Sequence, residues 1–155
     1  MTDDSAKTRS GRRLLRLGML LFLLGLVTGL LVPALANPRM GLSSHLEGLM
    51  NGMFLMLLGL LWPRLRLSRR AGGVAFGLAV YGAYVNWATT LAAAFWGAGG
   101  AMMPMAAQGR TGTPVQELLV TFGLVSLTLA ILGACGLVFW GLRGADDPPV
   151  EGSAR

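Results

Sequence analysis

Residues 14–36 read LLRLGMLLFLLGLVTGLLVPALA and contain one charged side chain, that of Arg16. A helix needs about 20 predominantly apolar residues to cross the hydrocarbon core of a bilayer, and this run is long enough. Three further apolar runs of comparable length follow at residues 44–62, 73–96 and 116–142. The sequence therefore predicts an all-α integral membrane protein in which four spanning helices form a bundle.

The composition agrees with this class of protein. Of 155 residues, 54% are hydrophobic and only 13% are charged, which is too apolar for a soluble domain of this length. The four runs leave no room for a second domain, so we expect one membrane domain over residues 1–155, with flexible cytoplasmic tails at 1–13 and 143–155. The single cysteine, Cys135, cannot form an internal disulfide and is predicted to be a buried packing residue.

The positive charges are distributed asymmetrically about the four runs. The net charge of +6 is compatible with nucleic-acid binding, but the basic residues flank the membrane runs instead of forming one patch. Cytoplasmic segments of membrane proteins collect Lys and Arg. Two of the three connections between the apolar runs contain a single basic residue each, Arg39 in the first and Arg110 in the third. We therefore expect an inner-membrane protein with both termini and the middle connection in the cytoplasm, contacting lipid and not nucleic acid. The other basic residues are Lys7, Arg9, Arg12, Arg13, Arg16, Arg64, Arg66, Arg69, Arg70, Arg143 and Arg155.

The N-terminal run has an alternative interpretation as a cleaved secretory signal. Arg12 and Arg13 precede it, and the segment PALANP at residues 33–38 resembles a cleavage site. The apolar run is longer than the roughly 7–15 residues of a signal core. We therefore expect it to be kept as the first membrane helix.

Local motifs predict where the helices begin. Pro38 cannot continue a helix and restrains the preceding residue, so a turn is expected after the first run. Ser44 and Glu47 have the spacing of a capping box for the second helix, and Thr113 and Gln116 have the same spacing before the fourth. Glycine pairs at helix-contact spacing predict close helix approaches. These pairs are Gly25 with Gly29, Gly48 with Gly52, and Gly73 with Gly77.

Ionisable and amide side chains inside membrane runs are costly, so they are functional candidates by default. Glu47 and Glu117 also have a structural interpretation, because each lies near a predicted helix start. Asn51 and Asn86 either bridge helices or line a site. Since Glu47 and Asn51 are four residues apart, they share one face of the second helix.

His45 is the only histidine and is predicted in the first turn of the second helix. It is either a hydrogen-bonded polar residue at the membrane interface or a ligand. One histidine cannot assemble a zinc site, but it can supply the single proximal ligand of a haem, whose other face a methionine such as Met50 or Met53 could close. Asn51 lies about 240° around the helix from His45, so only a planar cofactor shared between subunits could touch both flanks.

The usual catalytic signatures are missing from this sequence. It contains no Ser-His-Asp set, phosphate-binding loop, dinucleotide fingerprint or HExxH motif. Hydrolysis and nucleotide chemistry are therefore disfavoured. The remaining candidate is Lewis-acid or redox chemistry on an apolar substrate that arrives through the bilayer.

Two blocks of sequence carry a family likeness. The segments NPRMGLSSHLEG (37–48) and AVYGAYVNWATTLAAAFWGAGG (79–100) closely resemble the hydroxylaminobenzene mutases, and the resemblance extends over residues 14–144. It implies an enzyme that converts hydroxylaminobenzene to 2-aminophenol by moving the hydroxyl from nitrogen to the ortho ring carbon. No net oxidation is involved.

A more distant resemblance links the pattern His-x5-Asn-Gly-Met at residues 45–53 to the styrene oxide isomerases. That family has four membrane spans and forms a trimer that holds ferric haem b between subunits. The resemblance implies that His45 is the axial ligand of the iron, that Met53 belongs to the cofactor site and that Asn51 orients the substrate. Ferric iron with an open position would draw electron density from the oxygen of the N–O bond.

The third helix matches the styrene oxide isomerases less completely. Asn86 corresponds to an asparagine of that family, but the position of its tyrosine falls on Thr90. Tyr81 and Tyr84 lie one or two turns earlier, so the resemblance does not assign either phenol cleanly. We take Tyr84 as a candidate together with Glu47.

The expected function is isomerisation of a small aromatic hydroxylamine by a haem-containing homotrimer. Epoxide isomerisation on the same scaffold is the alternative within enzymes. A small multidrug transporter would also have four short spans, but it needs a carboxylate deep in the membrane, and neither Glu47 nor Glu117 is predicted there. A non-catalytic haem-binding membrane protein is the remaining alternative.

Overall fold

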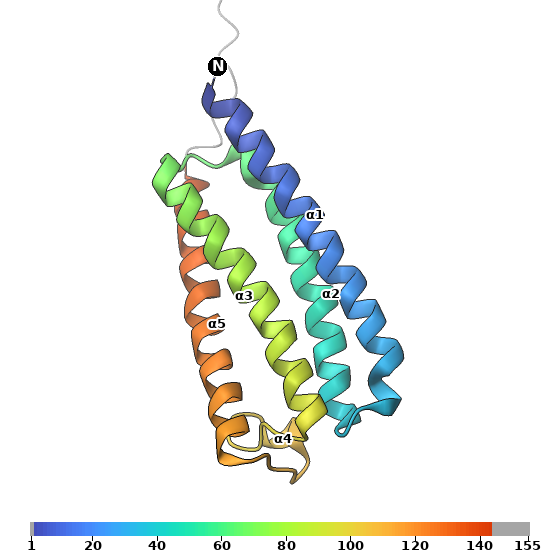
Figure 1. Cartoon of the computed structure of the whole chain (residues 1–155). Helices are drawn as coiled ribbons and strands as arrows, with labels where there is room; N and C mark the ends of the chain where they lie inside the picture. Colours follow the sequence, from blue (N-terminus) through green and yellow to red (C-terminus); the bar gives the residue numbers. More distant parts are fainter. Residues whose placement is uncertain (1, 144–155) are drawn as a thin grey trace, which may run out of the picture.

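The computed structural model describes residues 2–143, with side chains described from Ser5 onward, and this part of the chain is all-α (Figure 1). Four long helices carry the fold, and a short helix, α4, lies in the connection between the last two. Single 3₁₀ turns, η1 and η2, follow the first and second helices. The elements are α1 (Thr2–Leu31), η1 (Val32–Ala34), α2 (Pro38–Leu61), η2 (Trp62–Arg64), α3 (Arg69–Trp96), α4 (Pro104–Ala107) and α5 (Pro114–Gly141).

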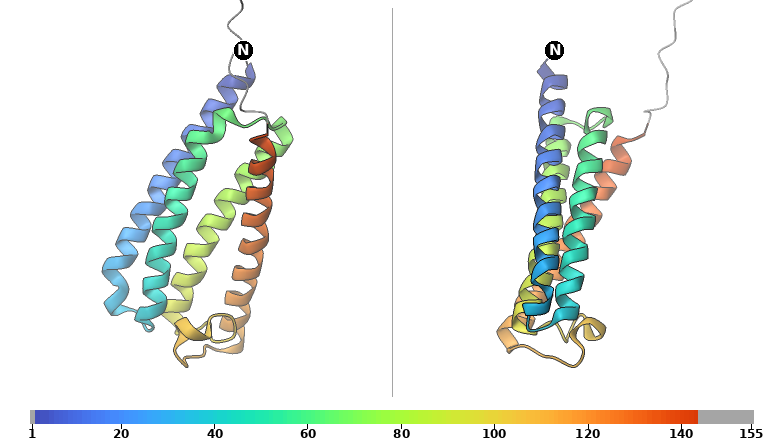
Figure 2. Two further views of the ribbon diagram at one scale, coloured as in Figure 1. Left: turned by 180° about the vertical axis from the view of Figure 1, so that it is seen from behind. Right: turned by 90° about the vertical axis from the view of Figure 1, so that its right-hand side faces the viewer.

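The long helices lie side by side in the order α1, α2, α3, α5 (Figures 1 and 2). Helix α2 packs against both α1 and α3, α1 also makes a smaller contact with α3, and α3 packs against α5. Within the described residues, no Cα atom of α1 or α2 comes within 8 Å of α5. The expected all-α fold with four long helices is confirmed, but a single chain forms an open row and not a closed bundle.

The start of α2 differs from the sequence prediction. The helix begins at Pro38, where the side chain of Asn37 accepts a hydrogen bond from the Met40 N–H at 3.1 Å. The predicted capping box is wrong, because the Ser44 hydroxyl lies inside α2 and donates to the Trp87 carbonyl of α3 at 3.1 Å. Asn37 therefore sets the helix start, and Ser44 joins two helices.

The other helix ends are formed by the local capping interactions that their residues favour. Thr113 and Gln116 form the predicted capping box of α5, with both reciprocal hydrogen bonds present. Ser68 caps α3, which ends at Gly97 with a left-handed backbone (φ 63°). Helix α1 begins at Thr2, so most of the predicted N-terminal tail is helical. Of the predicted C-terminal tail, residues 144–155 lie outside the described part.

Glycines allow α1 and α2 to pack with their backbones in contact. A Cβ atom added at Gly18 would lie 2.7 Å from the Gly52 carbonyl oxygen, and one at Gly25 would lie 2.8 Å from the Gly48 carbonyl carbon. The contacts predicted for these small residues are therefore confirmed. A Cβ at Gly77, or at Gly73, would meet nothing within 4 Å, so the third predicted pair makes no helix contact within the chain.

Within the part of the chain that the structure describes, three stretches are long and apolar enough to cross a membrane: Ser5–Ala34, Pro38–Arg64 and Pro114–Gly141. They indicate a multi-pass membrane protein. Helix α3, where the fourth span was predicted, is as long as α5 but does not reach the same apolarity, because it is rich in Gly and Ala and carries several polar side chains.

The outer face of α5 is apolar and exposed. Phe122, Leu129 and Leu132 are each about two-thirds exposed, which suits a surface in contact with lipid acyl chains. Cys135 is also exposed on this helix, so the prediction that it is a buried packing residue is wrong. Its position on an outward face, and not the apolarity of its neighbours in sequence, decides its exposure.

Candidate functional site

Three of the predicted site residues meet between α2 and α3. One carboxylate oxygen of Glu47, Oε2, accepts a hydrogen bond from Asn86 Nδ2 at 2.5 Å and another from Asn51 Nδ2 at 3.1 Å. All three side chains are half-buried. The interpretation of Glu47 as a helix cap is wrong, since α2 begins nine residues earlier and the carboxylate is bound by the two amides. We call these three residues the carboxylate–amide cluster.

The cluster keeps several polar atoms available for a ligand. Its internal bonds use only Oε2 of Glu47 and the Nδ2 groups of Asn51 and Asn86. Every buried side-chain nitrogen or oxygen within residues 5–143 has a hydrogen-bond partner. The unpartnered Oε1 of Glu47 and the two amide oxygens are therefore accessible, and all three atoms can accept hydrogen bonds.

His45 lies on the other flank of α2, against α1. Its Nδ1 is 2.8 Å from the Gly25 carbonyl oxygen. Because a carbonyl only accepts, Nδ1 carries the proton and Nε2 has the free lone pair. No partner of Nε2 is found in the described residues, so this atom is accessible as well. His45 sits two turns into α2 and not in its first turn, because the helix begins at Pro38.

The surroundings of His45 contain polar contacts that the sequence did not single out. Trp87 Nε1 of α3 donates to the Thr28 hydroxyl at 3.0 Å, and Thr28 donates to the Leu24 carbonyl within α1 at 2.8 Å. The Trp87 carbonyl accepts from Ser44 of α2. Thr28 and Ser44 are fully buried. Their hydroxyl groups within apolar runs were the sequence feature from which these hydrogen bonds could have been predicted. These bonds hold three helices together beside the histidine.

The two tyrosines are engaged in helix contacts. The Tyr84 hydroxyl donates to the Leu17 carbonyl of α1 at 2.9 Å, and the Tyr81 hydroxyl donates to Ser126 of α5 at 2.9 Å. Tyr84 makes no hydrogen bond to the carboxylate–amide cluster among the described residues. Met53, the other predicted cofactor residue, is 45% exposed on α2.

The acidic and histidine side chains of the described residues do not gather into a metal cage. Within residues 5–143, whose side chains are described, no group of three or more His, Cys, Asp or Glu side chains is placed to hold a metal ion. His45 therefore has no second described His, Cys, Asp or Glu beside it with which to build a zinc site, and its accessible Nε2 is one nitrogen that could bind a metal.

Glu117 has a structural position at the opposite end of the row from the N-terminus. Its Oε1 accepts from the backbone N–H groups of Gly99 and Gly112, each at 2.8 Å. Gly100 and Ala101 donate to the same carboxylate at 3.3 Å. The structural interpretation of Glu117 therefore holds, although its partners lie in the connection between α3 and α5 and not within its own helix.

Comparisons with known proteins give consistent relatives. A family model described as "Styrene oxide isomerase" matches residues 10–143. The hydroxylaminobenzene mutase HabB of Ectopseudomonas oleovorans is 63% identical over 146 residues, covering 91% of this chain and 89% of the relative. The mutase HabA of the same organism is 50% identical over 117 residues, covering 76% of this chain and 87% of the relative. No solved structure matches the chain.

The residues of the site lie within the matched region, and the match extends over nearly the whole described part of the chain. Both curated relatives are enzymes by name and are covered over most of their own length. The chain therefore belongs to the styrene oxide isomerase family.

Proposed function

We propose that this chain is a membrane mutase that isomerises hydroxylaminobenzene-type aryl hydroxylamines to 2-aminophenols. The observation that carries the proposal is the 63% identity to the mutase HabB over 91% of the chain. The half-buried polar residues Glu47, Asn51 and Asn86, which assemble into one cluster, give such an enzyme a candidate site.

The cluster has the groups that this isomerisation needs. The N–O bond breaks, a bond forms between oxygen and the ortho carbon, that carbon loses a proton and the nitrogen gains one. The accessible Oε1 of Glu47 can accept the proton from carbon and return it to nitrogen, so no external acid or base is consumed. The amide oxygens of Asn51 and Asn86 can accept the N–H and O–H groups of the substrate and orient it.

We propose haem b as the cofactor, with His45 as the residue that would hold its iron. The fit rests on the tautomer of the ring, because the proton held at Nδ1 by the Gly25 carbonyl leaves Nε2 free and accessible. When bound, ferric iron would supply a Lewis acid that polarises the oxygen of the substrate. Met53, exposed on the same helix, would contact the cofactor. Tyr84 stays a predicted contributor to catalysis through its position on α3.

We propose that the protein works as a homo-oligomer, most simply a trimer. In the open row of helices, the half-buried cluster would otherwise face lipid, where an unpaired polar atom costs several kcal/mol. A second copy placed against the row would exclude lipid from the cluster. It would also allow a planar cofactor to lie between subunits.

We propose that α3 is a fourth membrane span and that both termini are cytoplasmic in an inner membrane. Helix α3 packs between α2 and α5, both apolar enough to cross the bilayer, and it is as long as α5. The basic side chains cluster at one end of the row, as the positive-inside rule requires of a cytoplasmic side.

Epoxide isomerisation is the second candidate, because the family model that matches residues 10–143 is named for styrene oxide isomerase. The transporter alternative is less well supported than the enzyme, although Glu47 lies deeper in α2 than the sequence indicated. Its carboxylate is bonded by two amides, and both curated relatives are mutases by name.

One experiment tests the substrate and the cofactor together. Full-length protein in detergent would be given hydroxylaminobenzene or styrene oxide, with product identified by chromatography, and its absorption spectrum would be compared with that of His45→Ala. We expect 2-aminophenol to be the faster product and a Soret band that disappears or shifts in His45→Ala. A folded, colourless wild type that still forms 2-aminophenol would remove the haem but keep the mutase. Phenylacetaldehyde as the faster product would favour the epoxide isomerase.

A further inference from the structure

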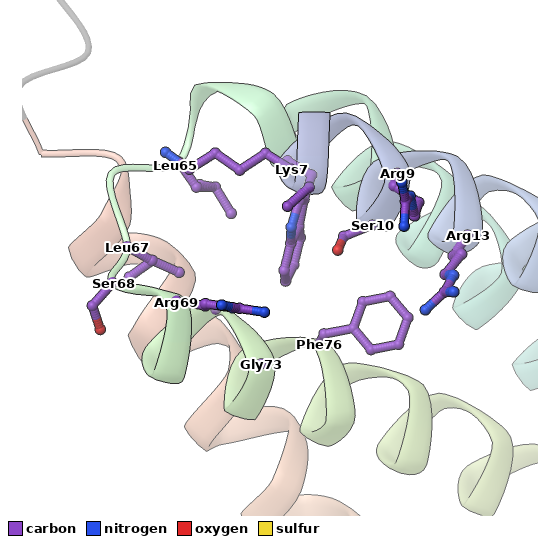
Figure 3. Close-up of a pocket in the computed structure, with 13 residues that line it drawn as sticks. Lys7, Arg9, Ser10, Arg13, Leu65, Leu67, Ser68, Arg69, Gly73 and Phe76 are labelled. Carbon is purple, nitrogen blue, oxygen red and sulfur yellow. The ribbon is translucent and has the colours of Figure 1, made fainter. Parts of the chain in front are cut away.

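A basic cavity lies at the end of the row where α1 begins, far along the helices from the carboxylate–amide cluster. Its volume is about 360 Å³, and it is lined by the first turns of α1, by the connection that leads into α3 and by the start of α3 (Figure 3). Neither His45 nor any residue of the cluster lines it.

Four of the lining side chains are cationic. Lys7, Arg9 and Arg13 come from α1, and Arg69 comes from the first position of α3, so the charges converge from two elements. Among the lining residues whose side chains the structure describes, none is acidic, and Arg9, Arg13 and Arg69 make no ion pair with a described acidic side chain. Like charges that share one cavity repel each other, so an anion would lower the energy of the arrangement.

The spacing along α1 places this charge on a defined face. Arg9 and Arg13 are four residues apart and share one face of α1. Ser10 and Ser68 also line the cavity and add hydroxyl donors. The guanidinium groups present forked donors that match the oxygens of a phosphate.

The floor of the same cavity is apolar. Trp62 and Phe76 pack edge to face, with ring centroids 5.9 Å apart, and Leu65 and Leu67 line the wall beside them. Trp62 and Leu65 are almost fully buried by the protein itself, so the apolar surface that a soluble anion would leave uncovered is that of the half-buried Leu67 and Phe76. A phospholipid would cover it with its glycerol and acyl region while its phosphate met the arginines.

We propose that this cavity binds the phosphate of an anionic phospholipid headgroup. The cavity lies beside the C-terminal end of α2, the end opposite Asn37, and it shares no residue with the carboxylate–amide cluster. The proposed lipid site is therefore independent of the isomerisation. Its basic rim and aromatic floor belong to the membrane–water interface, where anionic headgroups are found.

The test is lipid binding to full-length protein in detergent, measured by native mass spectrometry. Phosphatidylglycerol is titrated against wild type and the double variant Arg13→Gln/Arg69→Gln, with Arg12→Gln/Arg70→Gln as the control. The control removes the same charge from the adjacent positions of the same helices, but neither Arg12 nor Arg70 lines the cavity. We expect the cavity variant to bind ~10-fold or more weakly and the control to bind within about threefold of wild type.

Equal loss in the two double variants would overturn the proposal, because it would show attraction to net charge and not to a site. Binding of phosphatidylcholine as tightly as phosphatidylglycerol would overturn it too. Sodium phosphate distinguishes the source of the anion: displacement of the lipid at comparable concentration assigns the cavity to free phosphate, and no displacement assigns it to the headgroup. If the double variant does not fold, Arg13→Gln and Arg69→Gln are tested singly, each with an expected loss of about threefold.

Discussion

At the scale of single residues, the proposed catalytic role of Glu47 is the most direct to test. Its Oε2 is held by two amides, and its Oε1 is accessible. Replacement by Gln keeps the size of the side chain but removes the base and presents an NH₂ group to the Asn51 and Asn86 amides. We expect Glu47→Gln to lower kcat for 2-aminophenol formation by ~100-fold or more.

Initial rates, normalised to protein content in membranes, measure this effect. The control is Ser43→Ala, because the exposed Ser43 hydroxyl bonds only to the Arg39 carbonyl of its own helix at 3.3 Å. A Glu47→Gln variant as active as the Ser43→Ala control would assign the carboxylate to structure and leave the proton transfer to another group.

At the scale of elements, the contact between α1 and α2 depends on glycine. A Cβ at Gly18 would lie 2.7 Å from the Gly52 carbonyl oxygen and 2.8 Å from the Met56 amide nitrogen, and neither backbone atom can move without moving the helix. We expect Gly18→Ala to lower the free energy of unfolding by ~1–3 kcal/mol. For a chain of this size that corresponds to a thermal midpoint lower by ~2–4 °C for each kcal/mol.

A thermal melt of purified protein in detergent checks this value. Gly136→Ala on α5 is the control, because its added methyl would meet nothing within 4 Å and alanine is the better helix former by ~1 kcal/mol. Equal midpoints for the two variants would show that α1 and α2 can separate without cost.

The connection between α3 and α5 depends on a single carboxylate. Glu117 accepts four backbone N–H groups from this segment, which a neutral amide cannot match. We expect Glu117→Gln to lower the thermal midpoint by several degrees, for a loss of ~1–3 kcal/mol, while kcat per folded molecule stays near that of wild type. A large fall in kcat without a change in the midpoint would instead place Glu117 in the active site.

The sequence predicted these elements unevenly. Thr113 and Gln116 identified the start of α5 because a capping box is a local interaction, readable from spacing alone. Ser44 and Glu47 have the same spacing but form no cap, because partners on α3 compete for both side chains. Those partners are distant in sequence, so spacing could not reveal them.

The candidate site was predicted in its residue types but not in its geometry. Polar residues in apolar runs identified Glu47, Asn51, Asn86 and His45, and the first three do meet. The position of the proton on His45 depends on the Gly25 carbonyl, which is a backbone atom on another helix. No sequence pattern records such a contact.

At the scale of the whole molecule, the orientation in the membrane follows from the distribution of charge. Cys135 is the only cysteine, so Cys135→Ala provides a background for single labelling sites. With Met105→Cys, at the end of the row remote from the N-terminus, we expect labelling of intact cells by a membrane-impermeant maleimide. With Ser68→Cys we expect labelling only after the cells are opened.

Both positions suit labelling, because Met105 is 84% exposed and Ser68 is exposed at the start of α3. Labelling of Ser68→Cys in intact cells would reverse the proposed orientation. Labelling of both sites in intact cells would mean that α3 does not cross the bilayer.

The hydrogen bond between His45 and Gly25 has a consequence for evolution. The acceptor is a main-chain carbonyl, so the accepting atom is present whatever residue stands at position 25, but its approach to His45 requires that Gly25 lack a Cβ, which would lie 2.8 Å from the Gly48 carbonyl carbon. The chemical form of the imidazole is therefore inherited together with the spacing of two helices, and the surrounding surface can diversify toward new substrates without disturbing it. Substitutions on the surrounding surface would then leave the hydrogen bond in place, provided that Gly25 and Gly48 keep the two helices in contact.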